Sequence, residues 1–552
     1  MITSMPPQWD EVVDVVVLGS GAAGLTAATL AADGGSEVLL LEKADLIGGT
    51  TAVSGGMPWI PMNRHMADLG EADSREDALT YIRRLTLGRE PDPELIETYV
   101  DTAAEMLDYL ETKTPLRMSA PAMFADYYAD LPGGKRAGRS IEPMPFNSRS
   151  ELGDWFPRVR TTPHMLSLTM DEGMRFLTGA EPPDLARAET RDVEGIRVLG
   201  PSLVASLFKG LLDRGVDVRT GTAAEELIVV DGAVSGVRTK GGQLFGARQA
   251  VVLACGGFEW NEQMVQAFIG QRIEPMSPPY NEGDGHVMAM EAGAELANMT
   301  SFWGQPALIE PGFEYEGRPL PQMGSARSIP GVLVVNRHGR RFTNEGVTYQ
   351  DFPKVLGAFD PVANEYPNEG PVWLIFDHKV KESAVLLPSI LPGEPAPDWI
   401  DQAEGVRELA ARIGVDPDGL EATIVHWNEQ VASGEDADFH RGTVWFEAFS
   451  TGGPTPKGSL VPVATPPFYA LALHNGTLGT SGGPRIDANA RVRSYRGGVI
   501  PGLYAAGNAS ACVFGPAYPG GGATIGPALT FGYLAGKHAA GEPRRPLSIT
   551  PD

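Results

Sequence analysis

The chain has 552 residues, more than one hydrophobic core usually organises, so two or more domains with a cleft between them are expected. Its formal net charge of -26 at pH 7 argues against nucleic acid and anionic lipid, so the ligand is expected to be small or neutral. Only Cys255 and Cys512 are cysteines, which excludes a disulfide framework and a CxxC metal or iron–sulfur site; no metal site is predicted.

The first predicted unit is strand, tight turn, helix and strand. The apolar run 12–18 predicts a buried strand, and an Ala- and Leu-rich helical pattern follows it through Ala32. A second apolar run, 38–41, ends at Glu42 and completes a βαβ unit. Both runs have the composition of buried parallel strands, which predicts a doubly wound sheet.

The glycines after the first strand match the dinucleotide pattern GxGxxG. Gly19 permits the turn, Gly21 lets a pyrophosphate approach the backbone, and Gly24 lets the helix pack closely on the strand. The N-terminus of the helix attracts phosphate charge. Glu42, eighteen residues after Gly24, is predicted to accept hydrogen bonds from ribose hydroxyls and to repel a 2′-phosphate.

The rest of the chain divides by texture. Residues 147–194 are polar and weakly periodic, which favours a solvated loop with short helices over a lid. A later βαβ unit leads into the apolar run 251–257. Pro-rich, Trp-containing segments fill 298–475, strands and Gly-rich turns return from Gly476, and a last helix is predicted to begin near Pro527.

Small residues after Glu42 favour FAD over NAD. Residues 48–56 are Gly-Gly-Thr-Thr-Ala-Val-Ser-Gly-Gly, which suits a long ligand that runs past the ribose toward a flavin ring. Residues 502–508, Gly-Leu-Tyr-Ala-Ala-Gly-Asn, would place a strand end and a side chain against the ribityl chain. With Ala-Cys-Gly-Gly at 254–257, these segments resemble the FAD-binding pattern of the fumarate reductase/succinate dehydrogenase flavoprotein superfamily over almost the whole chain.

The resemblance implies an α/β fold, with a Rossmann-type FAD-binding domain in residues 1–297 and 476–552 and an inserted α+β catalytic (substrate) domain in 298–475. No motif marks a nucleophile for covalent attachment, so noncovalent FAD is expected. The predicted FAD-binding residues are Gly19, Gly21, Ala23, Gly24, Glu42, Lys43, Gly49, Thr50, Thr51, Ser54, Gly55, Gly56, Ala224, Gly256, Gly507, Asn508, Thr524 and Ile525.

Three motifs narrow the resemblance. The first is Asp-Tyr-Tyr at 126–128, the second is Asn-Glu at 344–345 with a tyrosine four residues later, and the third is Tyr-Pro-Gly-Gly-Gly at 518–522. In this order they resemble the 3-ketosteroid Δ1-dehydrogenases. The resemblance implies FAD-dependent 1,2-dehydrogenation of a 3-ketosteroid to a 1-ene-3-ketosteroid, with hydride passing from C1 to the flavin N5.

The same resemblance implies a role for each motif residue. Tyr349 removes a proton from C2, Tyr127 hydrogen-bonds to Tyr349, and Tyr518 with the backbone N–H of Gly522 polarises the C3 carbonyl. A phenol and an amide form a two-donor oxyanion hole, in which each donor is typically worth about 2.7 to 4 kcal/mol of barrier. A tyrosinate is a strong base but scarce at neutral pH, and a hydrogen bond from a second tyrosine favours it. Tyr128 in place of Tyr127 stays open as an alternative.

Several other functions remain open at this point. A fumarate-reductase-like enzyme would have an arginine at the position of Tyr349. A Δ4-dehydrogenase of saturated 3-ketosteroids, or a flavin dehydrogenase of another cyclic ketone, would account for two departures from the family pattern, Ser481 in Gly-Thr-Ser-Gly-Gly and Gly521 in the tyrosine turn. A flavin-binding sensor without turnover is a further alternative.

The predicted partners are a steroid or other cyclic ketone and a diffusible, quinone-like electron acceptor. A second dinucleotide fingerprint, a haem motif and a cluster spacing are all missing from the sequence. Residues 1–11 lack the pattern of a secretory signal, and the apolar runs are too short for a transmembrane segment of roughly 20 residues. A cytoplasmic location is expected, with loose peripheral membrane association left open because steroids partition into membranes.

Overall fold

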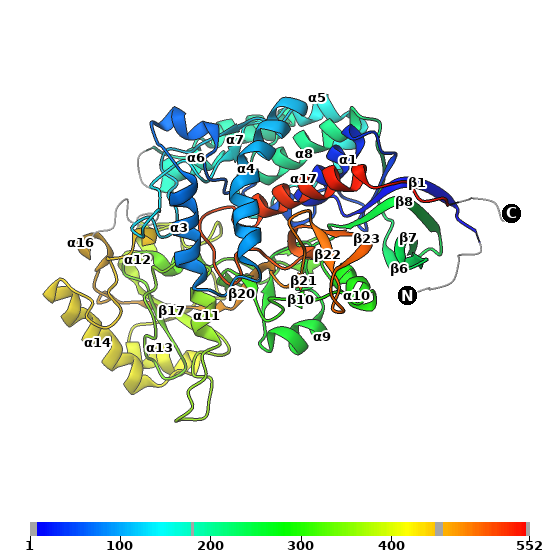
Figure 1. The fold of residues 1–552 in the computed structure, drawn as a ribbon. Coiled ribbons are helices and arrows are strands. Elements are labelled where there is room, and N and C mark those ends of the chain that lie inside the picture. The colour runs from blue at the N-terminus through cyan, green and yellow to red at the C-terminus, as the bar shows by residue number, and fades with distance from the viewer. Residues whose placement is uncertain (1–7, 178–180, 448–455, 548–552) are drawn as a thin grey trace.

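The computed structural model of the chain describes residues 8–177, 181–447 and 456–547. Figure 1 shows the blue, cyan and red elements from the two ends of the chain gathered around one sheet, which also takes in green strands at right, and the yellow-green and yellow elements form a second body at lower left. None of the helices in the described ranges combines the length and apolar character needed to cross a bilayer.

The first sheet has eight strands and a parallel centre. The order of its strands is β22 (Arg491–Arg493), β23 (Val499–Ala505), β8 (Leu244–Leu253), β1 (Glu11–Leu18), β2 (Val38–Leu41) and β5 (Asp217–Arg219). Two further strands branch from β8: β7 (Ala233–Thr239) pairs with β8, and β6 (Ala224–Val230) pairs with β7. The strand β1 pairs in parallel with β2 and β8. Seven of its eight residues are buried, as expected for a strand covered on both faces.

Helices α1 (Ala22–Asp33) and α17 (Ile525–Gly541) pack closely against each other beside this sheet (Figure 1). Glycines on α17 permit the contact, because a Cβ at Gly532 would lie 2.5 Å from the Ala23 carbonyl oxygen and one at Gly536 would collide with that of Ala27. The other α-helices in the described part of this body are α2 (Gly49–Val53), α3 (Arg75–Thr86), α4 (Pro93–Lys113), α5 (Ser148–Leu152), α6 (Met170–Leu177), α7 (Leu185–Glu194), α8 (Leu199–Leu212), α9 (Glu262–Met264) and α10 (Asp284–Glu291).

The second sheet has six strands. Its path runs β15 (Gln322–Met323), β12 (Ala307–Leu308), β19 (Phe468–His474), β17 (Val372–Asp377) and β16 (Leu333–Val335), and β18 (Asp401–Ala403) pairs with β19. Side chains of β17 alternate between two cores, as a strand buried on both faces requires. Leu374 and Phe376 pack toward α11 (Phe352–Leu356) and α12 (His378–Ser383), whereas Ile375 packs toward α13 (Val406–Ile413) and α14 (Pro417–Ser433).

Short strands connect the two bodies. In one small sheet β20 (Gly476–Thr480) lies between β9 (Glu274–Pro275) and β11 (Phe302–Gly304), and in another β10 (Leu296–Ala297) pairs with β21 (Gly483–Pro484). These pairings join segments close to the predicted boundaries at 297/298 and 475/476. The division into domains stays a prediction.

The predicted α/β class is confirmed, and the elements near the glycine motifs are close to their expected bounds. The strand expected at 12–18 begins one residue earlier, and the last helix begins at Ile525, two residues before Pro527. The segment 147–194 holds three short α-helices and the 3-10 helix η2 (Gly153–Arg158).

Candidate active site

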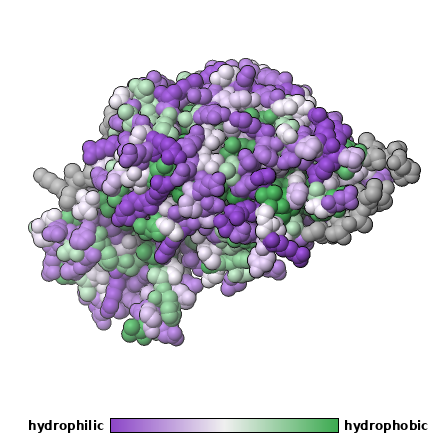
Figure 2. Space-filling view, viewed as in Figure 1, coloured by the Kyte–Doolittle hydropathy of each residue, from purple (hydrophilic) through white to green (hydrophobic). Residues whose placement is uncertain are grey.

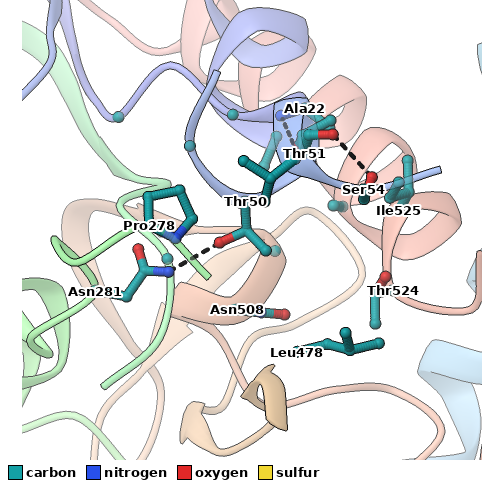
Figure 3. Close-up of a pocket in the computed structure, with 18 of the residues that line it drawn as sticks. Ala22, Thr50, Thr51, Ser54, Pro278, Asn281, Leu478, Asn508, Thr524 and Ile525 are labelled. Carbon is teal, nitrogen blue, oxygen red and sulfur yellow. Dashed lines mark hydrogen bonds between the residues drawn. The ribbon is translucent and has the colours of Figure 1, made fainter. Parts of the chain in front are cut away.

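A cavity of about 350 Å³ collects the motif residues from distant parts of the chain. All four predicted catalytic residues line it, and so do all the predicted FAD-binding residues except Gly24. Figure 3 shows its α2 side, where Ala22, Thr50 and Thr51 face Thr524 and Ile525 at the start of α17. The residues that sequence reasoning assigned to cofactor and substrate therefore face one continuous space.

Glycine is required at two positions of the first turn for two different structural reasons. Gly19 has a φ of +103°, and a Cβ there would lie 2.5 Å from the Ala254 carbonyl oxygen. A Cβ at Gly24 would collide with the Gly19 carbonyl, so this glycine packs the helix against the strand and does not line the cavity. A Cβ at Gly49 would meet no protein atom within 4 Å, so the space beside it belongs to the cavity.

Glu42 is held at the end of β2. Its Oε2 accepts hydrogen bonds from the Ser20 amide at 3.0 Å and from the Ser20 hydroxyl at 2.6 Å, and its Oε1 accepts from the Ala44 amide at 2.9 Å. The residue is 7% exposed and lines the cavity. A carboxylate fixed in this way suits a ribose with free hydroxyls, as predicted from the sequence.

The start of α1 and the helix α2 form the phosphate end of the cavity. The amide of Ala22 donates to Thr51 Oγ1 at 3.1 Å, and Ser54 Oγ donates to the Thr51 carbonyl at 2.8 Å (Figure 3). The helix N-terminus, the glycine-lined space and the hydroxyls fit the pyrophosphate of FAD. When bound there, FAD would be held by the residues named above, from Gly19 to Ile525.

Part of the segment 147–194 covers the cavity, which sequence reasoning did not predict. Arg160, His164, Met165 and Met170 line it. Arg160 pairs with Glu316 at 2.6 Å, and burial lowers the pKa of His164, which favours the neutral imidazole. The alternative of a covering segment therefore describes residues 160–170 better than a solvated loop. The sequence signal was weak, because two methionines in a polar stretch do not form a period.

Three tyrosines meet at the other end of the cavity. The hydroxyl of Tyr127 lies 2.8 Å from that of Tyr349, and the two rings meet edge to face with centroids 5.4 Å apart. The ring of Tyr518 stacks on Tyr127 at 5.8 Å and meets Tyr349 edge-on at 5.5 Å. Tyr127 and Tyr518 belong to the first body, to which they come from the N-terminal and the C-terminal part of the chain. Tyr349 belongs to the second body.

Tyr127 and Tyr128 have different partners. The Tyr128 hydroxyl donates to the carboxylate of Asp351 and lies 3.4 Å from Thr348 Oγ1. The structure therefore pairs Tyr349 with Tyr127 and not with Tyr128, while the catalytic roles of the two tyrosines stay a prediction. Tyr128 instead ties the first tyrosine motif to the turn that carries Tyr349.

Buried ionic groups fix the loop that carries Tyr127. The Asp126 carboxylate, 2% exposed, accepts from the Trp59 indole at 2.7 Å and from the Arg139 guanidinium at 2.8 Å. The Tyr127 amide donates to the Pro519 carbonyl at 3.2 Å, which ties this loop to the turn at 518–522. Charged groups buried in pairs and hydrogen-bonded hold side chains within a narrow range of positions.

A second buried network supports Tyr349. The Glu345 carboxylate bonds to Arg341 at 2.7 Å and to Arg441 at 3.3 Å. The guanidinium of Arg327 donates to the main-chain carbonyls of Glu345 and Val347, at 2.7 Å in the second case. Tyr349 thus follows a turn whose backbone is held by the buried Arg327 and whose Glu345 side chain is held by Arg341 and the buried Arg441.

Burial sets the charge state of the phenols. It raises the pKa of Tyr349 and of Tyr127 well above the usual 10, and it also raises that of Tyr518. Interactions with the Tyr349 hydroxyl, the Thr524 hydroxyl and the Gly522 amide lower the pKa of Tyr518 and offset part of this effect. A neutral Tyr518 keeps its O–H proton, which suits a hydrogen-bond donor to a carbonyl oxygen.

Positions 521 and 522 in the turn have no room for a side chain. Gly522 has a φ of +95°, and a Cβ there would collide with the Met57 carbonyl. A Cβ at Gly521 would lie 2.5 Å from Phe124 Cε1, so a neighbouring aromatic ring fills the space where a side chain at this position would lie. The other departure, Ser481, is 1% exposed, and its hydroxyl has no hydrogen-bond partner among the described residues.

Comparisons with known proteins agree with this geometry. The chain matches the FAD binding domain family over residues 14–525. It is 40% identical to the 4-oxocyclohexanecarboxylate 2-dehydrogenase of Sinomonas cyclohexanicum, over 96% of this chain and 93% of the relative. It is 37% identical to the 3-oxosteroid 1-dehydrogenase of Mycobacterium tuberculosis, over 96% of this chain and 98% of that relative.

A solved structure agrees over the same length. The crystal structure of the 3-ketosteroid Δ1-dehydrogenase from Sterolibacterium denitrificans, in complex with 1,4-androstadiene-3,17-dione, superposes with a TM-score of 0.88 at 34% identity. The match covers 96% of this chain and all of the other.

Proposed function

The chain belongs to the FAD binding domain family and, within it, to the 3-ketosteroid Δ1-dehydrogenases; from this premise we propose that it desaturates the C1–C2 bond of a 3-ketosteroid. FAD is its cofactor. The observation that carries the proposal is the meeting of Tyr127, Tyr349, Tyr518 and Gly522 in the cavity that the FAD-binding residues line.

The substrate ketone lies against the turn at 518–522. The Tyr518 hydroxyl and the Gly522 amide donate to the C3 oxygen, so negative charge that develops there is stabilised as C2 loses its proton. The tyrosinate form of Tyr349 receives that proton on its phenolic oxygen, to which the Tyr127 hydroxyl donates a hydrogen bond at 2.8 Å. Bound FAD supplies the hydride acceptor for C1. The protein's own part is positioning and electrostatics.

The lining of the cavity favours a neutral, apolar substrate. Methionines 57, 165, 170, 276, 288 and 323 face it. The two cationic side chains in the described part of the lining are already paired, Lys43 with Asp284 at 2.8 Å and Arg160 with Glu316 at 2.6 Å. A substrate carboxylate would have to displace one of these acidic partners, and this supports a steroid over a charged ketone.

The 40% identity to an enzyme named for 4-oxocyclohexanecarboxylate favours a second candidate, a small cyclic ketone that carries a carboxylate. Anaerobic flavin reduction separates the two. We expect a 3-keto-4-ene steroid to bleach the yellow protein with a higher kcat/KM than 4-oxocyclohexanecarboxylate, and the product to carry a new C1–C2 double bond. The reverse order would assign the second candidate, and bleaching by neither would contradict both.

The electron acceptor is proposed to be a diffusible quinone-like molecule. This follows from the sequence, which carries one dinucleotide fingerprint and no haem or cluster motif. A cytoplasmic location is proposed with it, supported by the two cysteines, which are free of a disulfide as in a reducing compartment; loose membrane association stays a prediction. Reoxidation of the bleached protein by a soluble quinone, faster than by oxygen, would support the acceptor.

A further inference from the structure

A buried acid lies behind the cofactor cavity. Glu259 is 3% exposed and follows β8. Its Oε1 accepts hydrogen bonds from Ser277 Oγ and Asn281 Nδ2, both at 2.7 Å, and its Oε2 accepts from the Thr480 amide at 3.2 Å. All three neighbours donate hydrogen bonds, so the site suits a side chain whose two oxygens both accept hydrogen bonds.

This acid fixes the orientation of Asn281. An amide side chain has an oxygen that accepts and a nitrogen that donates, so an accepting carboxylate selects the nitrogen. The second N–H of the same nitrogen donates to Thr50 Oγ1 at 2.8 Å, as Figure 3 shows. Thr50 lines the cavity, and Asn281 lines it as well.

The direction of these bonds leaves one proton unused. Because Thr50 Oγ1 accepts from Asn281, its own O–H is available to donate elsewhere. We propose that Glu259 and Asn281 form a relay that makes the Thr50 hydroxyl a hydrogen-bond donor to an acceptor oxygen of bound FAD, and so strengthen cofactor binding. The inference depends on FAD being the cofactor and goes beyond the desaturation proposed above.

The backbone beside the relay is shaped to hold it. Gly256 has a φ of +81°, and a Cβ there would collide with Asn281 Oδ1. A Cβ at Gly257 would collide with Glu259 Oε2 and Thr480 Oγ1. The two glycines after β8 therefore leave room for the acid and the amide, and Gly256 also lines the cofactor cavity.

A double-mutant cycle on FAD affinity tests the relay. The dissociation constant of FAD from the apoprotein would be measured by flavin fluorescence for the wild type, Glu259→Gln, Thr50→Val and the double variant. Glutamine has the same shape as glutamate but can donate to Asn281, which lets the amide reverse and consume the Thr50 proton. We expect each single change to weaken binding about three- to tenfold, the range of one hydrogen bond, and the double variant to be no weaker than either. Thr50→Ser, which keeps the hydroxyl that Thr50→Val lacks, should bind FAD as the wild type does.

Additive losses in the double variant, or an unchanged affinity in Glu259→Gln, would overturn the relay. The melting temperature of each apoprotein checks that the variants fold. If Glu259→Gln does not fold, the same cycle with Asn281→Ala and Thr50→Val gives the same decision. Bleaching of the FAD-loaded wild type by substrate tests the proposed desaturation separately, so failure of the relay is distinguishable from failure of that proposal.

Discussion

At the scale of single residues, the candidate site uses three phenols in different ways. In the proposed reaction Tyr518 keeps its proton, and it interacts with Tyr349, Thr524 and the amide of Gly522, whereas Tyr349 takes up a proton and has the Tyr127 hydroxyl as a hydrogen-bond donor. Burial favours the neutral form of both. The same environment therefore helps the donor and opposes the base, and the cost of ionising Tyr349 must appear in the rate.

Replacing Tyr518 by phenylalanine removes one of the two donors to the carbonyl. We expect kcat/KM to fall by a factor that corresponds to a loss of roughly 2 to 4 kcal/mol of transition-state stabilisation, because the Gly522 amide alone remains as a donor. Steady-state kinetics with the steroid at fixed pH measures this. An unchanged kcat/KM would remove Tyr518 from the oxyanion hole.

The raised pKa of Tyr349 predicts an alkaline pH dependence. A base works only when deprotonated, so its active fraction increases with pH until the pKa is passed, and burial moves that point above 10. We expect kcat/KM to rise by about tenfold per pH unit from neutral pH to about pH 10 without a plateau. A plateau near neutral pH would contradict Tyr349 as the base that must be ionised.

At the scale of elements, the covering helix α6 depends on a buried acid. Glu142 is 3% exposed and accepts hydrogen bonds from the amides of Met170 and of Asp171, the latter at 3.1 Å. Met170 lines the cavity. Burial raises the pKa of Glu142 from its usual 4.5 to about 7. The hydrogen bonds at the start of the covering helix α6 therefore depend on the charge state of Glu142.

Because the folded pKa of Glu142 is above its unfolded value, its contribution to stability is present below about pH 4.5 and lost as the pH rises through about 7. Glu142→Gln should remove this dependence. We expect the free energy of unfolding of the variant to gain on the wild type between pH 5 and 8, by up to about 3 kcal/mol. Urea unfolding across this range measures it, with the exposed Glu151→Gln as control; parallel curves for Glu142→Gln and wild type would refute the effect.

The sequence predicts some elements better than others for physical reasons. The strand β1 and the turn after it could be predicted because an apolar run ends in glycines whose functions follow from local geometry. The cover formed by residues 160–170 could not, because its order comes from contacts with distant groups such as Glu316. The relay through Glu259 and Asn281 was missed for the same reason: hydrogen-bond direction is a property of the assembled site.

At the scale of the whole molecule, the negative net charge and the cavity between the two bodies suit a small ligand. Acidic residues number 70 against 44 lysines and arginines. Figure 2 shows one face on which purple hydrophilic residues cover most of the surface and green hydrophobic residues appear as scattered patches. The tyrosines predicted to be catalytic come from both bodies, with Tyr349 following β16 of the second sheet. A cofactor that fills the cavity should therefore stabilise the whole chain.

Adding FAD to the apoprotein should raise its melting temperature in proportion to the logarithm of the free concentration. At a hundred times the Kd, the expected stabilisation is about 2.7 kcal/mol. Differential scanning fluorimetry measures the shift. NADP⁺ is the matched control, because the Glu42 carboxylate is expected to repel its 2′-phosphate. Equal shifts with the two nucleotides would argue against selection by Glu42.

The most direct test follows flavin bleaching in Tyr349→Phe. The wild type and the variant, both loaded with FAD, would be mixed anaerobically with a 3-keto-4-ene steroid in a stopped-flow instrument. We expect the variant to bind the steroid, seen as a perturbed flavin spectrum, and to bleach at least about a hundredfold more slowly, because a general base typically contributes 10²- to 10⁴-fold. Bleaching of the variant at the wild-type rate would show that another group takes the C2 proton.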